Sequence, residues 1–214
     1  MIKKVTVVDY GMGNLLSVMR AFQSCGVEAL ISQSVKEVAQ AEYLVLPGVG
    51  AFPDGIAALK KFGLDAAIHE YGLKERPFLG ICLGMQMMLS ASEEFGRHQG
   101  LNLIPGEVKA VPAVGVDGKP HKVPHVGWNK LVLPSGKDSW DGTLLRGIPL
   151  GSFVYFVHSY GVYPDDSSHR LADCDYDGCI ISAAIARNQF TGCQFHPEKS
   201  GPVGLGIINN FLGS

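Results

Sequence analysis

Cys82 is the residue of this sequence best placed to act as a nucleophile. It lies between an apolar run, residues 78–81, and a helix-like segment, and it is flanked by Gly80 and Gly84. Small residues on both sides permit a sharp strand-to-helix turn with unusual backbone angles. Such a turn lifts the sulfur out of the sheet at its carboxyl edge, where ligands bind in open α/β folds. The amino end of the following helix would favour the thiolate and direct backbone N–H groups at an oxyanion.

An inert buried cysteine is the alternative interpretation of Cys82, because most free cysteines are buried and unreactive. The flanking glycines favour the reactive interpretation. The other four cysteines lack such a setting, so we expect core or surface positions for Cys25, Cys174, Cys179 and Cys193. An odd number of cysteines without CxxC spacing also indicates a reduced, cytoplasmic environment.

A cysteine nucleophile needs a general base, which folding usually brings from a distant part of the sequence. Of the seven histidines, His196 is the best placed. It follows an apolar run that predicts a strand, and Pro197 prevents that strand from continuing. Glu198 comes directly after Pro197 and can fold back to hold the imidazole in one tautomer. Alone, His-Pro-Glu is equally compatible with a surface turn, but together with Cys82 it predicts a Cys-His-Glu triad.

The elements that position Cys82 alternate between strands and helices along the first half of the chain. Apolar runs predict strands at residues 5–8, 43–46 and 78–81, the second of them stopped by Pro47. Helical spacing predicts helices at residues 15–25, capped by Asn14, and at residues 65–71 and 84–89. Strand–helix alternation implies crossover connections and therefore a parallel sheet.

The second half of the chain is richer in strands. We expect them at residues 108–111, 130–133, 153–157, 180–183 and 190–195, followed by a closing helix at residues 206–211. Turn signals separate some of these runs. They should add antiparallel strands to the same sheet or build a small flanking sheet. A length of 214 residues without an interdomain linker predicts one α/β domain, residues 1–214.

Composition excludes several classes of protein. Hydrophobic residues make up 46% and charged residues 18% of the sequence, which favours a large core over disorder. The formal net charge of -2 gives no electrostatic reason to expect a nucleic-acid or anionic-membrane partner. No run approaches the roughly 18 apolar residues of a membrane span, and the first residues show no signal-peptide pattern. No residue cluster has the spacing of a metal site.

Residues 80–86 (GICLGMQ) and 196–198 (HPE) together resemble the motifs of the class I (triad) glutamine amidotransferases. Further segments resemble the glutaminase subunits of imidazole glycerol phosphate synthase: residues 9–14 (DYGMGN), 47–52 (PGVGAF), 124–129 (PHVGWN), 158–160 (HSY) and 199–200 (KS). The similarity runs from about residue 5 to residue 212. One departure is Gly201-Pro202, where a more polar residue is expected; it affects the local loop and not the chemistry.

The resemblance implies a single amidotransferase domain with a doubly wound, flavodoxin-like sheet. It implies glutamine as the substrate and no metal or organic cofactor. It also implies a heterodimer with a separate (β/α)8-barrel synthase subunit, which uses the ammonia to make imidazole glycerol phosphate and an aminoimidazole carboxamide ribotide in histidine biosynthesis. A chain of 214 residues leaves no room for a fused barrel of about 250 residues.

The resemblance also assigns roles to further residues. Backbone N–H groups of Gly50 and Leu83 would form the oxyanion hole. Contacts with the substrate would come from Gly48, Gln86, His158, Ser159 and Tyr160. Contacts with the synthase subunit, and a relay from it, would involve Asn14, Trp128 and Lys199.

Each of these roles has a structural alternative. Residues 47–50 also fit an ordinary Pro-Gly turn, and Gln86 fits the polar face of a helix. His158 fits a satisfied core histidine, while Trp128, which we expect in a loop, fits a cap on the core. A dinucleotide-binding loop at residues 11–16 is excluded because Leu16 stands in place of the third glycine.

The expected chemistry is acyl transfer from the glutamine amide to Cys82, with His196 as acid and base and Glu198 orienting it. A γ-glutamyl hydrolase or a cysteine peptidase is a rival enzyme with a similar turn. A regulatory scaffold without turnover is the non-enzymatic rival, and the intact set of Cys82, His196 and Glu198 argues against it.

Overall fold

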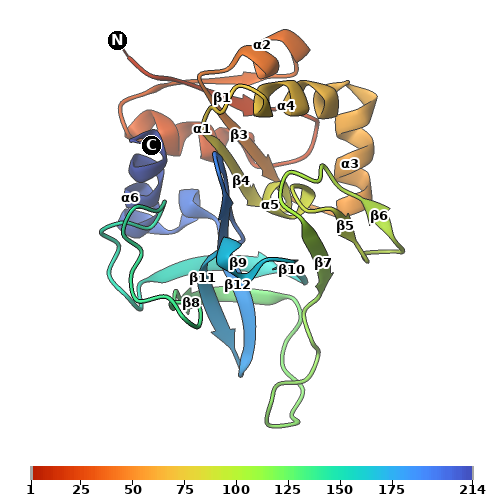
Figure 1. The fold of residues 1–214 in the computed structure, drawn as a ribbon, viewed down its shortest axis with the longest axis vertical. Helices are drawn as coiled ribbons and strands as arrows, with labels where there is room; N and C mark the ends of the chain where they lie inside the picture. Colours follow the sequence, from red (N-terminus) through yellow and green to blue (C-terminus); the bar gives the residue numbers. More distant parts are fainter. Residues whose placement is uncertain (1, 214) are drawn as a thin grey trace.

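A mixed sheet forms the centre of the protein in the computed structural model, which describes residues 2–213 (Figure 1). Within these residues the sheet has seven strands. In their order across the sheet they are β11 (Arg170–Tyr176), β12 (Cys179–Arg187), β13 (Phe190–Cys193), β4 (Phe78–Cys82), β3 (Tyr43–Gly48), β1 (Lys4–Val8) and β2 (Glu28–Ser32). The five from β13 to β2 are parallel, in the order of a doubly wound, flavodoxin-like sheet. β11 and β12 are antiparallel additions.

Helices cover both faces of this sheet. α1 (Leu15–Ser24) and α6 (Gly201–Leu212) lie on one face, and the other carries α2 (Val35–Gln40), α3 (Phe52–Lys61), α4 (Leu64–Gly72) and α5 (Leu83–Met87). Alternate strand residues enter different cores: Val45 and Leu79 pack with α1 and α6, whereas Leu44 and Phe78 pack with the other helices. This arrangement confirms the predicted fold class.

Small sheets flank the main one. A four-stranded sheet contains β10 (Tyr160–Pro164), β7 (Gly106–Ala110), β5 (Ala91–Ser92) and β6 (His98–Gln99), and a two-stranded sheet contains β8 (His125–Lys130) and β9 (Phe153–His158). Short 3-10 turns occur at η1 (Ser167–His169) and η2 (Pro197–Lys199). Both expectations for the second half are therefore met, since it extends the main sheet and also builds flanking ones.

The prediction that Pro47 stops the strand at residues 43–46 is wrong. β3 continues to Gly48, and Pro47 and Gly48 pair with Ile81 and Cys82 of β4. β1 pairs with β3 only as far as Val45. Because β1 no longer pairs with β3 at Pro47, the missing N–H of Pro47 loses no hydrogen bond to β1, and the strand tolerates the proline.

The region around Trp128 also differs from expectation. Residues 125–130 form strand β8 and not a loop, whereas the expected strand at residues 130–133 is reduced to a bridge between Val132 and Asp173. β8 alternates between inward and outward residues, with His125 buried and Trp128 56% exposed. Trp128 therefore does not cap the core.

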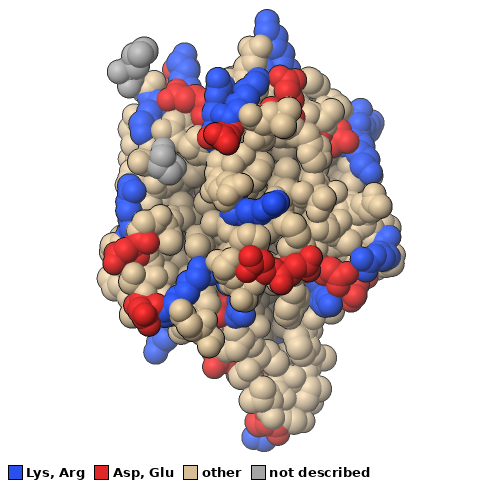
Figure 2. Space-filling view, in the orientation of Figure 1, with Lys and Arg blue, Asp and Glu red and all other residues tan. Residues whose placement is uncertain are grey.

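Acidic and basic side chains are mixed over the face of the molecule in Figure 2, without an extended basic patch. Within residues 2–213, no helix is both long and apolar enough to cross a bilayer. The same residues contain no group of three or more His, Cys, Asp or Glu side chains that could hold a metal ion.

Candidate active site

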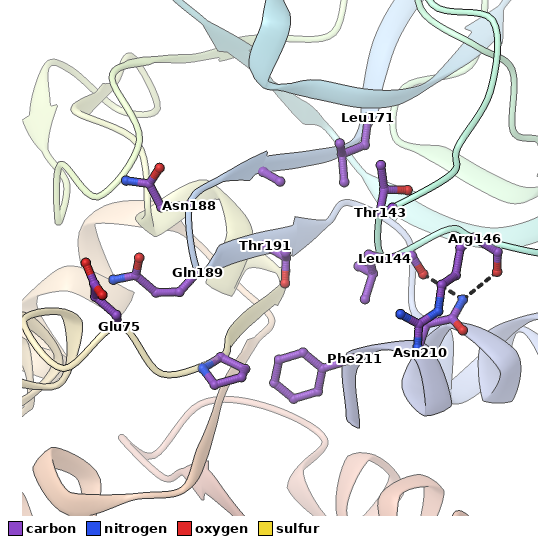
Figure 3. Close-up of a pocket in the computed structure, with 13 residues that line it drawn as sticks. Glu75, Thr143, Leu144, Arg146, Leu171, Asn188, Gln189, Thr191, Asn210 and Phe211 are labelled. Atoms are coloured by element: carbon purple, nitrogen blue, oxygen red, sulfur yellow. Dashed lines mark hydrogen bonds between the residues drawn. The ribbon is translucent and has the colours of Figure 1, made fainter. Parts of the chain in front are cut away.

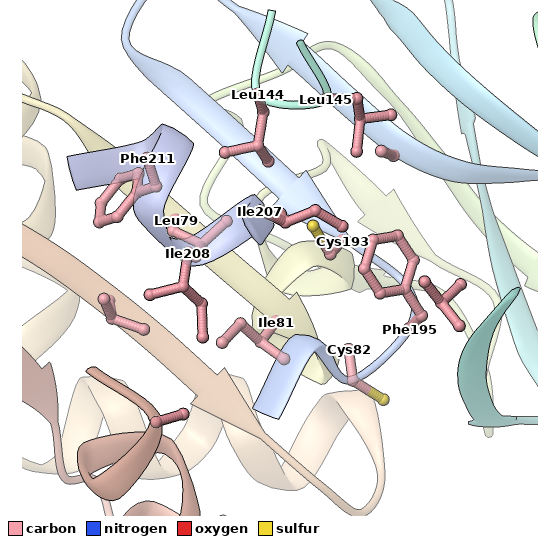
Figure 4. Close-up of a cluster of buried hydrophobic side chains, with 14 of the residues drawn as sticks. Leu79, Ile81, Cys82, Leu144, Leu145, Cys193, Phe195, Ile207, Ile208 and Phe211 are labelled. Carbon is pink, nitrogen blue, oxygen red and sulfur yellow. The ribbon is translucent and has the colours of Figure 1, made fainter. Parts of the chain in front are cut away.

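Cys82 occupies a strained turn between β4 and α5. Its backbone angles are φ 54° and ψ -111°, a conformation that residues with a Cβ rarely adopt. The neighbouring glycines are required by close packing: a Cβ on Gly84 would lie 1.7 Å from the Leu46 carbonyl oxygen, and one on Gly80 would lie 2.8 Å from the Met85 backbone. Figure 4 shows the sulfur pointing away from the buried cluster on which this strand end rests.

His196 and Glu198 form a buried pair. Nδ1 of His196 lies 2.7 Å from Oε1 of Glu198, so the ring carries its proton on Nδ1 and directs Nε2 elsewhere. The backbone amide of His196 donates to the carbonyl oxygen of Tyr155 at 2.9 Å. Nε2 is buried and has no hydrogen-bond partner among the residues that the structure describes, which leaves it available for proton transfer.

The pKa of His196 reflects its surroundings. Burial lowers it, but the neighbouring Cys82 sulfur and Glu198 carboxylate outweigh burial and raise the pKa to about 9. His196 is therefore protonated at neutral pH beside Cys82. An imidazolium in that position can donate a proton to a leaving amine.

A cavity of about 290 Å³ opens above the sulfur. This volume is near the lower end for ligand pockets, about 300–1,000 Å³, and suits a ligand as small as an amino acid. Seven of the residues singled out from the sequence line it: Gly50, Cys82, Leu83, Gln86, His158, Ser159 and Tyr160.

Gly48 has a different place from the one expected. It does not line this cavity but is buried at the end of β3, where a Cβ would lie 2.1 Å from the Tyr10 hydroxyl oxygen. The hydroxyl donates to the carbonyl oxygen of Pro47 at 2.9 Å. Gly48 thus permits close packing of Tyr10 beneath the site and does not itself face a ligand.

His158 lines the cavity wall with both ring nitrogens occupied. Nδ1 lies 2.9 Å from the Tyr160 carbonyl oxygen, and Nε2 lies 3.0 Å from Nδ1 of His125. Burial lowers the pKa of both histidines to about 4, so both rings are neutral at physiological pH. His158 is a buried histidine whose two ring nitrogens are both used in hydrogen bonds within the cavity wall. It therefore has no donor left for a substrate.

Glu94 is a cavity residue that the sequence analysis does not single out. Its Oε2 accepts the backbone N–H of Phe52 at 2.8 Å, and it is the acidic residue among those lining the cavity. Next to the exposed Glu93 it has the pattern of a solvated surface charge. Only the packing of α3 against this segment brings it to the site, where a carboxylate can pair with an ammonium group.

A larger cavity of about 470 Å³ lies at the opposite edge of the sheet, where β4 and β13 begin (Figure 3). Two of its amide side chains already have partners: Asn210 donates to the carbonyl oxygens of Leu144 and Arg146, and Gln189 donates to that of Gly72. No cysteine or histidine lines it. This larger cavity therefore offers no nucleophile or base comparable to Cys82 and His196.

Two of the three expected interface residues meet at one ring. Trp128 packs on Tyr155 with ring centres 6.1 Å apart, and the Lys199 ammonium lies 5.8 Å from the centre of the same ring. Asn14 lies elsewhere, at the start of α1, where its side chain accepts from the Ser17 amide.

Sequence comparison places the chain among known proteins. The profile of the family described as glutamine amidotransferase class-I matches residues 6–213. Imidazole glycerol phosphate synthase subunit HisH 1 of Legionella pneumophila strain Paris is 55% identical over 208 residues, 97% of this chain and 98% of that protein. Subunit HisH of Geobacillus kaustophilus is 46% identical over 211 residues, 98% of this chain and 96% of the relative.

Solved structures share the fold at lower identity. PurLQS from Thermotoga maritima matches with a TM-score of 0.73 and 17% identity, covering 100% of this chain and 99% of that one. A glutamine amidotransferase from the same organism gives 0.60 and 18%, covering 92% and 77%. These likenesses support the fold alone, whereas the family match and the curated relatives confirm the resemblance found in the sequence. The chain belongs to the class-I glutamine amidotransferases.

Proposed function

We propose that this chain is the glutaminase subunit of an imidazole glycerol phosphate synthase. It hydrolyses glutamine and passes ammonia to a separate (β/α)8-barrel subunit, which makes imidazole glycerol phosphate and an aminoimidazole carboxamide ribotide in histidine biosynthesis. The observation that carries the proposal is the meeting of Cys82, on its strained turn, with the His196–Glu198 pair. The names of relatives that are 55% and 46% identical supply the pathway.

The first half of the reaction forms a thioester. The Cys82 thiolate attacks Cδ of glutamine, the C–S bond forms, and the carbonyl π electrons move onto oxygen. Backbone N–H groups of Gly50 and Leu83, which both line the cavity, stabilise this oxyanion. The C–N bond then breaks as His196 gives its Nε2 proton to the departing nitrogen. Ammonia and a γ-glutamyl thioester result.

The second half restores the enzyme. His196, now neutral, accepts a proton from water as the water oxygen attacks the thioester carbonyl. Collapse of the second tetrahedral intermediate breaks the C–S bond and releases glutamate and the thiolate. Glu198 accepts the Nδ1 hydrogen of His196 throughout, at the distance of 2.7 Å found in the structure, and so keeps Nε2 directed at the reacting atoms.

The amino-acid end of glutamine would lie at the Glu94 side of the cavity. An α-ammonium group needs acceptors, and the Glu94 carboxylate supplies a charged one. Gln86 uses its amide hydrogens on the Tyr160 carbonyl and on Gln194, which leaves Oε1 as a second acceptor. Ser159 and Tyr160 complete this wall.

The synthase subunit would dock on the outer face of the β8–β9 pair. Three apolar side chains there are 47–56% exposed: Val126, Trp128 and Phe153. Apolar groups gathered on a surface are typical of a protein interface. Lys199 and Tyr155 lie next to them. Both form backbone hydrogen bonds with His196, so a partner on this surface would contact residues that hold the base.

Measurement of glutamate release with and without the barrel subunit and its nucleotide ligand tests the proposal. We expect glutamate from free glutamine in both cases and, when the barrel subunit is absent, an equal amount of ammonia. No γ-glutamyl peptide or protein should be cleaved. Cleavage of such peptides would favour the γ-glutamyl hydrolase or peptidase alternative. Absence of any turnover in the complex would contradict the proposal and favour a scaffold.

A further inference from the structure

We propose that Gln194 is a further catalytic residue, whose side-chain amide donates a hydrogen bond to the Cys82 sulfur and stabilises the thiolate. Gln86 and His158 act as positioning residues that fix the orientation of this amide. The inference rests on the proposed function, because it takes Cys82 as the nucleophile. Gln194 lies between the end of β13 and His196 and is completely buried.

The contact on which the inference depends joins Nε2 of Gln194 to the Cys82 sulfur at 3.7 Å. Buried amide hydrogens require acceptors, and sulfur is a weak acceptor as a thiol but a stronger one when charged. The Gln194 backbone is held by its own bond from N to the Ala183 carbonyl at 2.9 Å. The side chain therefore reaches the sulfur from a fixed strand extension.

A second neighbour of the sulfur disfavours the thiolate that this donor stabilises. The Val157 carbonyl oxygen lies 3.8 Å from the Cys82 sulfur. It can accept the S–H hydrogen of the neutral thiol, but its partial negative charge repels a thiolate. The Gln194 amide is a neutral donor that favours the charged form and so opposes the carbonyl.

The orientation of the Gln194 amide follows from its neighbours. The Tyr160 carbonyl oxygen can only accept, so the Gln86 atom 3.0 Å from it must be Nε2. The same nitrogen lies 3.1 Å from Gln194, whose facing atom must then be the acceptor Oε1. Nε2 of Gln194 is consequently the atom that faces sulfur.

Two histidines hold the Tyr160 carbonyl in place. Since this oxygen accepts from Nδ1 of His158 at 2.9 Å, Nε2 of that neutral ring is an acceptor. Nδ1 of His125, at 3.0 Å, is then the donor to it. His125 thus donates to His158, and His158 donates to the Tyr160 carbonyl. Gln86 donates to the same carbonyl and to Gln194, whose amide donates to the Cys82 sulfur.

Alkylation of Cys82 by iodoacetamide, followed by mass spectrometry of its peptide, tests the inference without glutamine or a partner. Gln194→Met removes the donor, and Gln194→Glu retains an acceptor for Gln86 but replaces the donor facing sulfur. A hydrogen bond to a charged group changes an equilibrium by roughly ten- to a hundredfold. We expect the alkylation rate at pH 7 and kcat to fall by about this factor in both variants, with KM nearly unchanged. At pH 10, where thiols generally ionise, the alkylation rates should converge.

The matched control is Gln189→Met, which removes a glutamine that donates to the Gly72 carbonyl far from the site; it should alkylate as the wild type does. Wild-type rates in both Gln194 variants at pH 7 would overturn the inference, as would an equal loss at pH 7 and pH 10, because that result indicates blocked access.

Two further outcomes distinguish failure of the inference from misfolding of a variant and from failure of the proposed function. Nitrogen-15 spectra of the wild type at pH 7 should show His125 and His158 as neutral rings protonated on Nδ1, and an Nε2-protonated ring at either position would overturn the hydrogen-bond directions. Loss of the proposed function has a separate signature, which is glutamine turnover by Cys82→Ala.

Discussion

Gly48 and Cys82 are paired residues at the carboxyl ends of β3 and β4. The chain that leaves β3 therefore emerges beside the nucleophile, and Val49 and Gly50 line its cavity. Gly50 has φ 105°, in a region that glycine adopts without strain. A donor on this segment can reorient while β4 keeps the sulfur in place, because the two groups belong to different strands.

Replacement of Cys82 by alanine should abolish glutamine hydrolysis and leave the fold and partner binding intact. Alanine keeps the Cβ at the strained backbone position, so only the sulfur is lost. Glutamate release measured by an enzyme-coupled assay should fall to background, while the thermal unfolding midpoint should stay close to that of the wild type. Turnover at even a few per cent of the wild-type rate would contradict the nucleophile assignment.

His196→Ala should lose as much activity as Cys82→Ala, because the base and the nucleophile act as one unit. Glu198→Gln should cost less, since the amide oxygen can still accept the Nδ1 hydrogen now bonded at 2.7 Å. Steady-state kcat values of the two variants decide the point. A larger loss in Glu198→Gln than in His196→Ala would show that the roles are wrongly assigned.

The turn around Cys82 was predictable because its signals are close together in the sequence. The apolar run at residues 78–81 and its two glycines are short-range signals, and the structure gives both glycines a packing reason. β2 shows why other elements were missed: its apolar run is only Ala29, Leu30 and Ile31, too short to stand out, and its residues alternate in exposure at the edge of the sheet. α3 had a usable signal in Pro53 near its start and in Phe52, Ile56 and Leu59 along one side.

The site was only partly predictable for a different reason. His196 and Glu198 are near neighbours in sequence, so their pairing could be expected from the motif. Glu94 and Gln194 reach the cavity or the sulfur through packing of distant segments, and no spacing rule connects them to Cys82. The bond between His125 and His158 likewise depends on the antiparallel register of β8 and β9, in which these two residues are partners.

Glu94→Gln should raise KM for glutamine by roughly ten- to a hundredfold with a smaller effect on kcat, because it removes the charge that pairs with the α-ammonium group. The amide oxygen can still accept from the Phe52 N–H, so the local fold is retained. The matched control is Glu93→Gln, at the exposed neighbouring position. An unchanged KM in Glu94→Gln would place the ammonium group elsewhere.

Stability should decline toward acid and alkaline pH because of different histidines. His125 and His158 have a pKa near 4 in the fold against an ordinary 6.5, so the unfolded chain binds protons first and stability falls between about pH 6.5 and pH 4. His196, raised to about 9, acts in the opposite sense: its contribution is complete below pH 6.5 and is lost as the pH rises through 9.

Thermal unfolding midpoints measured from pH 4 to pH 10 follow both the acid and the alkaline decline in stability. The variant His158→Gln lacks one of the groups that titrate on the acid side and should show a shallower decline between pH 6.5 and pH 4. The carboxylates common to both proteins cancel in this comparison. Equal slopes for variant and wild type would contradict the assigned direction.

The isolated chain should be a weak glutaminase that the barrel subunit and its ligand activate strongly. Ammonia released without an acceptor would waste glutamine, and one misplaced oxyanion donor changes a rate by about 10²–10³. Two routes connect the surface to the site. Met12, in the loop before Asn14, lies against Gly50, where a Cβ would be 2.7 Å from its terminal carbon. Lys199 lies over Tyr155, whose carbonyl binds the His196 amide.

Asn14→Ala and Lys199→Ala test these routes, because each removes one surface contact and leaves the reacting groups in place. We expect normal basal activity and a loss of most ligand stimulation, measured as steady-state glutamate release alone and in complex. Ser34→Ala controls for the loss of a helix cap at α2, and Lys61→Ala controls for the loss of a lysine over an aromatic ring. Both controls should keep full stimulation. If Asn14→Ala and Lys199→Ala bind the partner and respond fully, these residues only add interface area; if the isolated wild type is already fully active, activation by the partner is wrong altogether.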